Sequence, residues 1–225
     1  MKFFNGLKIR MGGGAGKTVA LALIALIISV AFAVFNGVIA VLERSVWYGA
    51  LSAYYITLIF FRGGVIIADR VCRKKFEGAV FSAVQNKIHL ASGAFLVITE
   101  GAMAVAVTQM VMYAPPVAMG EILAIANAAY AFFKITTAII NLVKAKKFAD
   151  PVSQSLRCLN FADACMSMVS LTVVLLTTFG QGGETGGGFI ALKACVGFAA
   201  CALVLALATY MIVASAKKLR SGKYE

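Results

Sequence analysis

Four ionisable residues lie in the middle of segments that are otherwise apolar: Arg62, Glu100, Lys134 and Asp163. A charge at bilayer depth is costly, so such residues usually face the interior of a helix bundle or a water-filled path. Two are basic and two are acidic, so they can neutralise one another as ion pairs. The acidic residues can also bind a proton or a cation, and the basic residues can contact an anion, as in membrane transporters and channels.

Further polar residues share helical faces with these charges. Each lies three, four or seven positions from Arg62, Lys134 or Asp163, a spacing that places it on the same face of a helix. They are Tyr55, Asn127, Tyr130, Asn141 and Asn160. Together with the four charges they make a candidate intramembrane polar site for transport.

The depth of each charge follows from its distance along the helix to the nearest basic residue outside the apolar segment. At about 1.5 Å per residue, Arg62 and Asp163 both lie about 10 Å from the same boundary, and Lys134 and Glu100 lie about 15 to 20 Å from it. We therefore expect two ion pairs, Arg62 with Asp163 and Lys134 with Glu100. The alternative is that such pairs only hold helices together, since polar contacts between helices stabilise membrane bundles.

The composition identifies the kind of protein that holds these charges. The chain has 225 residues, of which 61% are hydrophobic and 13% charged, and its mean hydropathy is +0.91. Soluble domains carry about 25% charged residues, so we expect an all-α integral membrane protein instead. Its five cysteines are scattered without a C-x-x-C pair. No metal-ligand cluster or catalytic constellation is visible, so we predict no cofactor, no metal site and no enzyme activity.

Six segments are apolar and long enough to cross a hydrocarbon core of about 30 Å, which needs about 20 helical residues. They are residues 18–42, 46–68, 88–113, 117–143, 156–180 and 189–214. We expect them to form a single transmembrane domain over residues 1–225. Because the polar residues are concentrated in the second to fifth segments, we expect these four to enclose the interior and the first and sixth to face lipid.

Basic residues alternate between the two sides of these segments. They gather before the first segment, between the second and third, between the fourth and fifth, and after the sixth. The opposite connections hold only Arg44, with Lys193 just inside the sixth segment. By the positive-inside rule, both termini are expected in the cytoplasm. The rule accounts for most of the net charge of +12 without a nucleic-acid partner, and contact with anionic lipid headgroups is an additional interpretation.

The basic connection at residues 69–87 also carries apolar residues at helical spacing: Phe76, Val80, Phe81 and Val84. This pattern predicts a short amphipathic surface helix, with its apolar residues against lipid and its basic residues in water.

A shift of 72 residues aligns two parts of the chain without a gap. Residues 60–62 then match 132–134, and 74–76 match 146–148, so that Arg62 corresponds to Lys134. Both stretches are predicted to run in the same direction, so a real duplication would be a parallel repeat of the kind found in some transporters. The alternative is that apolar helices ending in lysines resemble one another by composition alone.

Several stretches carry a resemblance to a group of small bacterial six-span membrane proteins of uncharacterised function. They are residues 134–136, 138–147 and 156–164, together with 47–51, Tyr54, Tyr55 and Arg62. The resemblance covers about half of the chain. It implies a bacterial inner membrane and supports the choice of Lys134 and Asp163, and it implies no activity.

These features predict a small transporter or channel subunit for an ion or small polar solute, with a polar path between the second and fifth segments. Glu100 and Asp163 would bind a proton or a cation, and Arg62 and Lys134 would act as counter-charges or anion contacts. The bilayer is the expected partner, and a homo-oligomer would help so small a bundle to enclose a path. The alternative is a membrane-embedded sensor or accessory subunit without transport activity, which holds a cytoplasmic partner through its basic connections.

Overall fold

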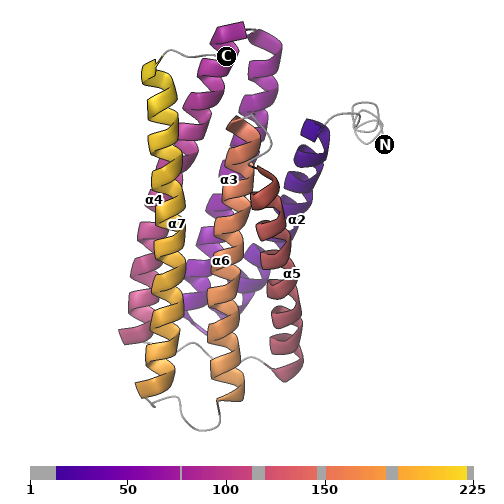
Figure 1. Ribbon diagram of the computed structural model, residues 1–225. Helices are drawn as coiled ribbons and strands as arrows, with labels where there is room; N and C mark the ends of the chain where they lie inside the picture. Colours follow the sequence, from indigo (N-terminus) through magenta and orange to yellow (C-terminus); the bar gives the residue numbers. More distant parts are fainter. Residues whose placement is uncertain (1–13, 77, 113–119, 146–150, 181–186, 222–225) are drawn as a thin grey trace, which may run out of the picture.

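The computed structural model describes residues 14–76, 78–112, 120–145, 151–180 and 187–221. Within these ranges the chain forms six α-helices and no strand (Figure 1). They are α2 (Gly14–Leu42), α3 (Val46–Lys75), α4 (Gly78–Met112), α5 (Glu121–Ala145), α6 (Pro151–Phe179) and α7 (Gly187–Ser221). The prediction of an all-α protein is confirmed for this part of the chain.

Four of the described helices are long and apolar enough to cross a membrane. The qualifying stretches are Val46–Lys75 in α3, Val80–Met112 in α4, Pro151–Phe179 in α6 and Gly188–Ser221 in α7. In α2 the described apolar stretch is shorter, at Ser29–Leu42. Helices satisfy their backbone polar groups internally, which a hydrocarbon environment requires. The four helices therefore indicate a multi-pass membrane protein.

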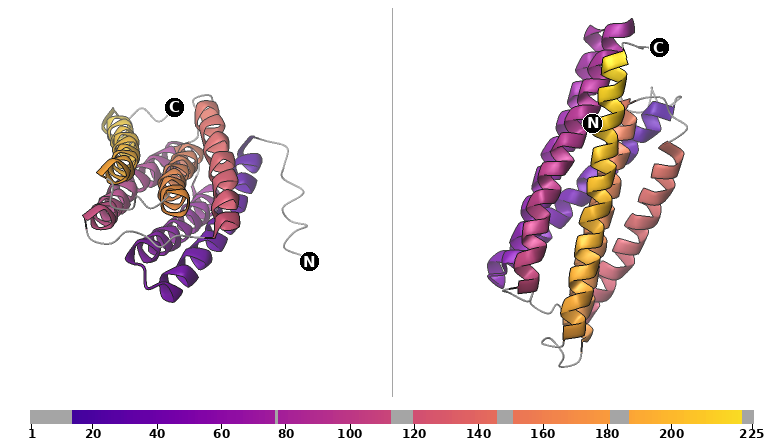
Figure 2. Two further views of the ribbon diagram at one scale, coloured as in Figure 1. Left: turned by 90° about the horizontal axis from the view of Figure 1, so that it is seen from below. Right: turned by 60° about the vertical axis from the view of Figure 1, so that its left-hand side comes forward.

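Helix α6 lies at the centre of the bundle and packs against α2, α3, α4, α5 and α7 (Figure 2). Small side chains recur along it, and Ala162, Ala164 and Ser167 are buried. Small residues let neighbouring backbones approach closely, which is a main source of helix association in membranes. A polar side chain on α6 can therefore meet several other helices at once.

Helices α4 and α7 lie side by side and run in opposite directions (Figures 1 and 2). Two glycines allow the close approach, because a Cβ at Gly93 would lie 2.8 Å from Cγ1 of Ile212 and one at Gly197 would lie 2.7 Å from Cγ1 of Val107. The prediction that the sixth segment faces lipid is therefore wrong for one side of α7. Its apolar residues pack as well against a helix as against lipid, so their composition did not distinguish the two.

The connection between α3 and α4 is a sharp turn. Helix α3 ends at Lys75, and Phe76 is extended with φ −127° and ψ 142°. Helix α4 begins at Gly78, whose φ of +61° is a conformation that glycine adopts without steric cost. The prediction of a separate surface helix within residues 69–87 is wrong, because these residues continue α3 and start α4.

Polar contacts hold the two helices together beside this turn. Asp69 of α3 accepts a hydrogen bond from Arg73 Nε at 2.7 Å and one from Gln85 Nε2 of α4 at 3.3 Å. The Arg73 guanidinium also lies 5.5 Å from the centre of the Phe81 ring. Phe81 is thus engaged within the hairpin, whereas Phe76 and Val80 remain exposed.

Candidate functional site

The candidate site is centred on Asp163, a residue of α6 that is 1% exposed. Its Oδ2 accepts a hydrogen bond from Arg62 Nη2 of α3 at 2.9 Å, and its Oδ1 accepts one from Lys134 Nζ of α5 at 2.5 Å. The predicted pair of Arg62 with Asp163 is confirmed. One carboxylate therefore joins two cations from two other helices, and we call these three residues the Asp163 cluster.

Hydroxyl and carbonyl groups surround the Arg62 side of the cluster. Arg62 Nη1 donates to Ser29 Oγ of α2 at 3.0 Å, and Nη2 also donates to the Leu159 carbonyl at 3.2 Å. Ser29 Oγ in turn donates to Asp163 Oδ2 at 3.4 Å. Because Arg62 is fully buried, these partners replace the water that its guanidinium loses on burial.

The Lys134 side contains hydroxyl groups and aromatic rings. Lys134 Nζ donates to Ser167 Oγ at 2.8 Å, and this hydroxyl also lies 3.2 Å from the Tyr55 hydroxyl. The ammonium lies 5.1 Å from the centre of the Tyr55 ring and 5.6 Å from that of Phe32, within range of a cation–π interaction. The Lys134 side chain keeps 13% of its surface exposed, against 0% for Arg62 and 2% for Asp163.

Glu100 of α4 does not join this cluster. It is fully buried, and its Oε1 accepts a hydrogen bond from the Tyr54 hydroxyl of α3 at 3.4 Å. The Cys201 thiol of α7 lies beside the same carboxyl group. Among the described residues, its Oε2 has no hydrogen-bond partner and no cation lies at ion-pair distance.

The predicted pair of Lys134 with Glu100 is therefore wrong. The two residues were matched by depth alone, and depth says nothing about which helices are neighbours. Helix α5 packs against α6, and α6 packs against α4. Because α6 lies between α5 and α4, the acidic side chain next to Lys134 is Asp163 of α6.

The other predicted site residues differ in their positions. Tyr55 belongs to the shell of the cluster. Asn127 and Asn160 are half-buried, and no hydrogen bond among the described residues links either of them to Asp163. The side chains of Tyr130 and Asn141 lie outside the described part of the structure. Among the predicted site residues on α5, Lys134 is thus the one whose polar contacts the structure describes.

Several contacting residues were absent from the predicted site: Ser29, Phe32, Tyr54, Ser167 and Cys201. Ser167 follows Asp163 by four positions, so helical periodicity carried a signal for it. Ser29 is one of few polar residues in its segment, which was a weaker signal. Nothing in the sequence distinguished Tyr54 or Cys201 from residues that only pack.

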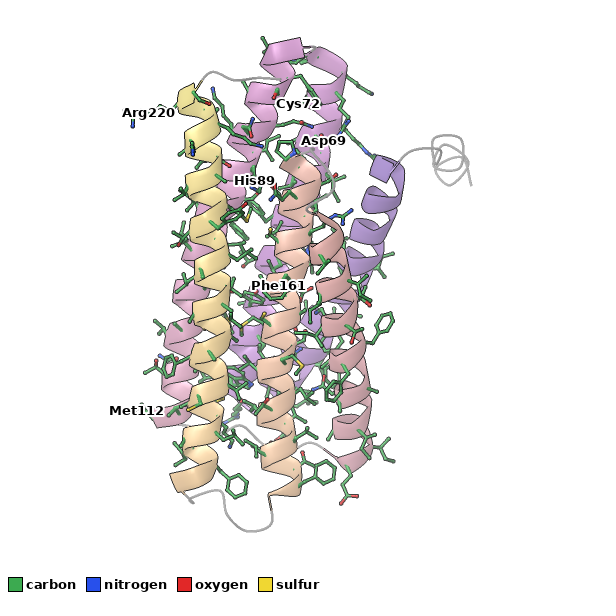
Figure 3. The ribbon with its side chains drawn as sticks, viewed as in Figure 1. Asp69, Cys72, His89, Met112, Phe161 and Arg220 are labelled. Atoms are coloured by element: carbon green, nitrogen blue, oxygen red, sulfur yellow. The ribbon has the colours of Figure 1, made fainter. Side chains whose placement is uncertain are left out.

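A second buried polar contact lies nearer the end of the bundle that holds Asp69. There His89 Nδ1 of α4 lies 2.6 Å from Ser155 Oγ of α6. In Figure 3, Asp69 and Arg220 mark this end, Met112 marks the opposite end and Phe161 lies between them. Asp163 follows Phe161 by two positions on α6, so the Asp163 cluster lies at the middle of the bundle.

An apolar groove runs over the outer surface of α2 and α3. Val34, Val38, Ile56 and Phe60 are among its lining residues, and no charged residue lines it. This groove does not reach the Asp163 cluster or Glu100. Arg62 and Asp163 are enclosed by the surrounding helices, and the three ionic groups of the cluster are paired with one another.

No protein-family model, curated protein or solved structure matches this chain. The function of the chain is therefore inferred from the chemistry of the Asp163 cluster and of Glu100.

Proposed function

We propose that the protein is a small membrane transporter or channel subunit for an ion or small polar solute, with its polar site between α3, α4, α5 and α6. Glu100 is the observation that carries this proposal. Helix adhesion accounts for Arg62, Lys134 and Asp163, which form ion pairs across three helices. It does not account for a fully buried carboxyl group that no described cation neutralises.

A series of polar groups connects the two parts of the site. Glu100 accepts from Tyr54, whose ring centre lies 5.8 Å from that of Tyr55. The Tyr55 hydroxyl contacts Ser167, and Ser167 accepts from Lys134. Buried ionisable residues in membrane proteins commonly mark ion pathways and proton relays, and this series supplies groups from four helices.

The proposed topology has six spans, formed by α2 to α7, with both termini in the cytoplasm of a bacterial inner membrane. The alternating basic residues support it, because positive charge is retained on the cytoplasmic side during insertion. The end of the bundle that holds exposed Arg70, Lys74, Lys75, Lys217 and Lys218 would then be the cytoplasmic end.

Flux measurements on purified protein in liposomes test the transport function. Liposomes that contain pyranine report protons and liposomes that contain lucigenin report chloride, and potassium and sodium are measured with their isotopes. We expect flux that is reduced at least tenfold in Glu100→Gln and Asp163→Asn. Thr108→Val is the matched control, because Thr108 is exposed on α4 and its hydroxyl bonds only the Ala104 carbonyl of its own helix. Unchanged flux in both site variants would refute the role of Glu100 and Asp163 in transport, and no flux in the wild type would refute the transport function.

A second candidate is an accessory or sensor subunit without transport. The enclosure of Arg62 and Asp163 favours it, since fully buried paired charges can serve to fix the arrangement of helices. Under this hypothesis a cytoplasmic partner co-purifies with the protein and is lost when Lys74 and Lys75 are changed to Gln. Co-purification that depends on these lysines, with no flux in any of the four assays, would establish this candidate in place of the first.

A further inference from the structure

The two acidic residues of the candidate site have opposite surroundings. Both oxygens of Asp163 accept from cationic groups, which stabilise its charged form. Glu100 is fully buried, its Oε1 accepts from the Tyr54 hydroxyl at 3.4 Å, and its Oε2 has no hydrogen-bond partner in the described part of the chain. A carboxylate that is buried with so little compensation is far less stable than the neutral acid, so such a group takes up a proton.

The surroundings of Glu100 are uncharged on every side that the structure describes. Helices α3, α6 and α7 pack against α4, and each brings one titratable side chain to the Glu100 carboxyl group. These side chains are Tyr54 of α3, Cys165 of α6 and Cys201 of α7. Tyrosine and cysteine are ordinarily uncharged at neutral pH. On α4 itself, Leu96 and Met103 lie one turn to either side of Glu100 and are buried.

We propose that Glu100 is a proton-binding site, that the proton is an ion which the proposed transporter moves, and that the enclosed structure is the proton-loaded state. The inference deepens the proposed function and rests on it for the transport step alone, since protonation of Glu100 follows from its burial. It narrows the sequence-based expectation that Glu100 and Asp163 both bind a proton or a cation. Asp163 keeps its charge, because Arg62 and Lys134 bind its two oxygens.

A proton fits the ligands at Glu100, whereas a metal cation does not. Mg²⁺ and Ca²⁺ take about six or more oxygen ligands, and the described contacts of Glu100 supply one carboxyl group and one hydroxyl. The neighbouring thiols suit softer metals, but no three His, Cys, Asp or Glu side chains of the described residues are grouped to hold a metal ion. A proton needs one oxygen and no cavity, and Oε2 is the oxygen without a partner.

The proton comes from water and returns to water. Binding forms an O–H bond at Oε2 and neutralises the carboxylate, while Oε1 keeps its hydrogen bond from Tyr54 as a carbonyl oxygen. Release breaks the O–H bond, passes the proton to a water molecule and leaves a carboxylate. Because the enclosed carboxylate is poorly compensated, release requires that water reaches Glu100. Movement of the surrounding helices would therefore control when the proton leaves.

Infrared difference spectroscopy of the purified full-length protein in liposomes measures the protonation of Glu100 independently of transport. A protonated carboxyl group has a C=O stretching band that a carboxylate lacks, and this band shifts in deuterium oxide. We expect the wild type to show such a band at neutral pH and to lose it reversibly at alkaline pH. Glu100→Gln, which resembles the neutral acid in shape, should lack the band. Glu121→Gln, which changes an exposed glutamate of α5, is the matched control and should keep it.

Tyr54→Phe provides a second measurement that does not change the acid itself. This variant keeps the ring and removes the hydroxyl that donates to Oε1. We expect the band to remain and to move to a higher wavenumber, because the carbonyl oxygen loses its hydrogen bond. An unmoved band would assign it to another carboxyl group and overturn the proposal. A wild-type band that Glu100→Gln does not remove would overturn it as well, and so would saturable binding of radioactive sodium or potassium that Glu100→Gln abolishes.

Proton flux, reported by pyranine in the same liposomes, separates the proton site from the transporter. We expect flux that is reduced at least tenfold in Glu100→Gln and unchanged in Glu121→Gln. The Glu100 band without flux of any ion would leave the proton site intact and refute the transporter. Flux of chloride, sodium or potassium without movement of protons would leave the transporter intact and refute the proton as its ion.

Discussion

Arg62 of α3 and Lys134 of α5, which lie 72 residues apart in the sequence, donate to opposite oxygens of the Asp163 carboxylate. The shift of 72 residues that aligns two parts of the chain also aligns these two basic residues. If the two stretches are a parallel repeat, each copy contributes one cation to a shared acid. Asp163 therefore connects α3, α5 and α6.

The first prediction concerns the dependence of the bundle on this carboxylate. Asp163→Asn leaves two buried cations without a compensating charge, so we expect a loss of about 3 to 5 kcal/mol in the free energy of unfolding. Unfolding of the purified protein by SDS in mixed micelles, with gluconate as the anion, measures this loss. The control is Ser170→Ala on the same helix, which should cost less than about 1 kcal/mol. An equal effect of both changes would show that the ion pairs do not stabilise the bundle.

The second prediction distinguishes arginine from lysine at position 62. Arg62 donates to Ser29, the Leu159 carbonyl and Asp163 from two separate nitrogens. A lysine carries a single point donor and cannot reproduce this fork. We expect Arg62→Lys to lower the free energy of unfolding by about 1 to 3 kcal/mol, since buried acceptors lose their donors.

Lys134→Arg is the matched comparison for this second prediction. Lys134 keeps partial exposure, so we expect the longer side chain to be accommodated with less than about 1 kcal/mol of lost stability. SDS unfolding of the two variants is compared under identical conditions. A larger loss for Lys134→Arg than for Arg62→Lys would contradict the difference in enclosure that the structure shows.

The third prediction separates the contribution of Glu100 to the stability of the protein from its contribution to transport. Glutamine has nearly the same shape, keeps an acceptor for Tyr54 and carries no charge. Since no described cation pairs with Glu100, we expect Glu100→Gln to change the free energy of unfolding by less than about 1 kcal/mol while it reduces flux. Unfolding and flux are measured on the same preparation. A stability loss as large as that of Asp163→Asn would mean that a cation outside the described residues pairs with Glu100.

The sequence predicted the buried charges and one of their pairs, for identifiable physical reasons. A charge inside an apolar segment is visible without a structure, and the helical rise gives its depth. Arg62 and Asp163 were matched correctly because their helices are neighbours. The pair of Lys134 with Glu100 failed because depth along the membrane leaves the lateral order of helices undetermined, and α6 lies between α5 and α4.

The position of α7 could not be predicted for a related reason. In a soluble protein an apolar face indicates the core, but in a membrane the lipid is equally apolar. Val204 and Ala208 of α7 are fully buried, while Leu203 and Val213 on the same helix are exposed, and no difference in residue type distinguishes them. Only small residues at close contacts carry a signal, and Gly93 and Gly197 are such residues.

The fourth prediction tests the contact of α4 with α7 at Gly93. A Cβ there would lie 2.8 Å from the Ile212 side chain and 3.1 Å from the Ala208 carbonyl oxygen. The side chain can rotate away but the backbone oxygen cannot, so Gly93→Ala must separate the helices slightly. We expect it to lower the free energy of unfolding by about 1 to 3 kcal/mol, which SDS unfolding measures.

Gly101→Ala on the same helix is the matched control for this contact. A Cβ at Gly101 has open space within 4 Å, and alanine is the better helix former, so this change should be neutral or stabilising by up to about 1 kcal/mol. Both changes replace glycine by alanine on the same helix, so they alter helix propensity alike. Opposite signs of the two changes in the free energy of unfolding would therefore come from the helix contact. Stabilisation by Gly93→Ala would show that α4 and α7 are farther apart in the membrane than in this structure, and Cys201 of α7 would then no longer be held against Glu100.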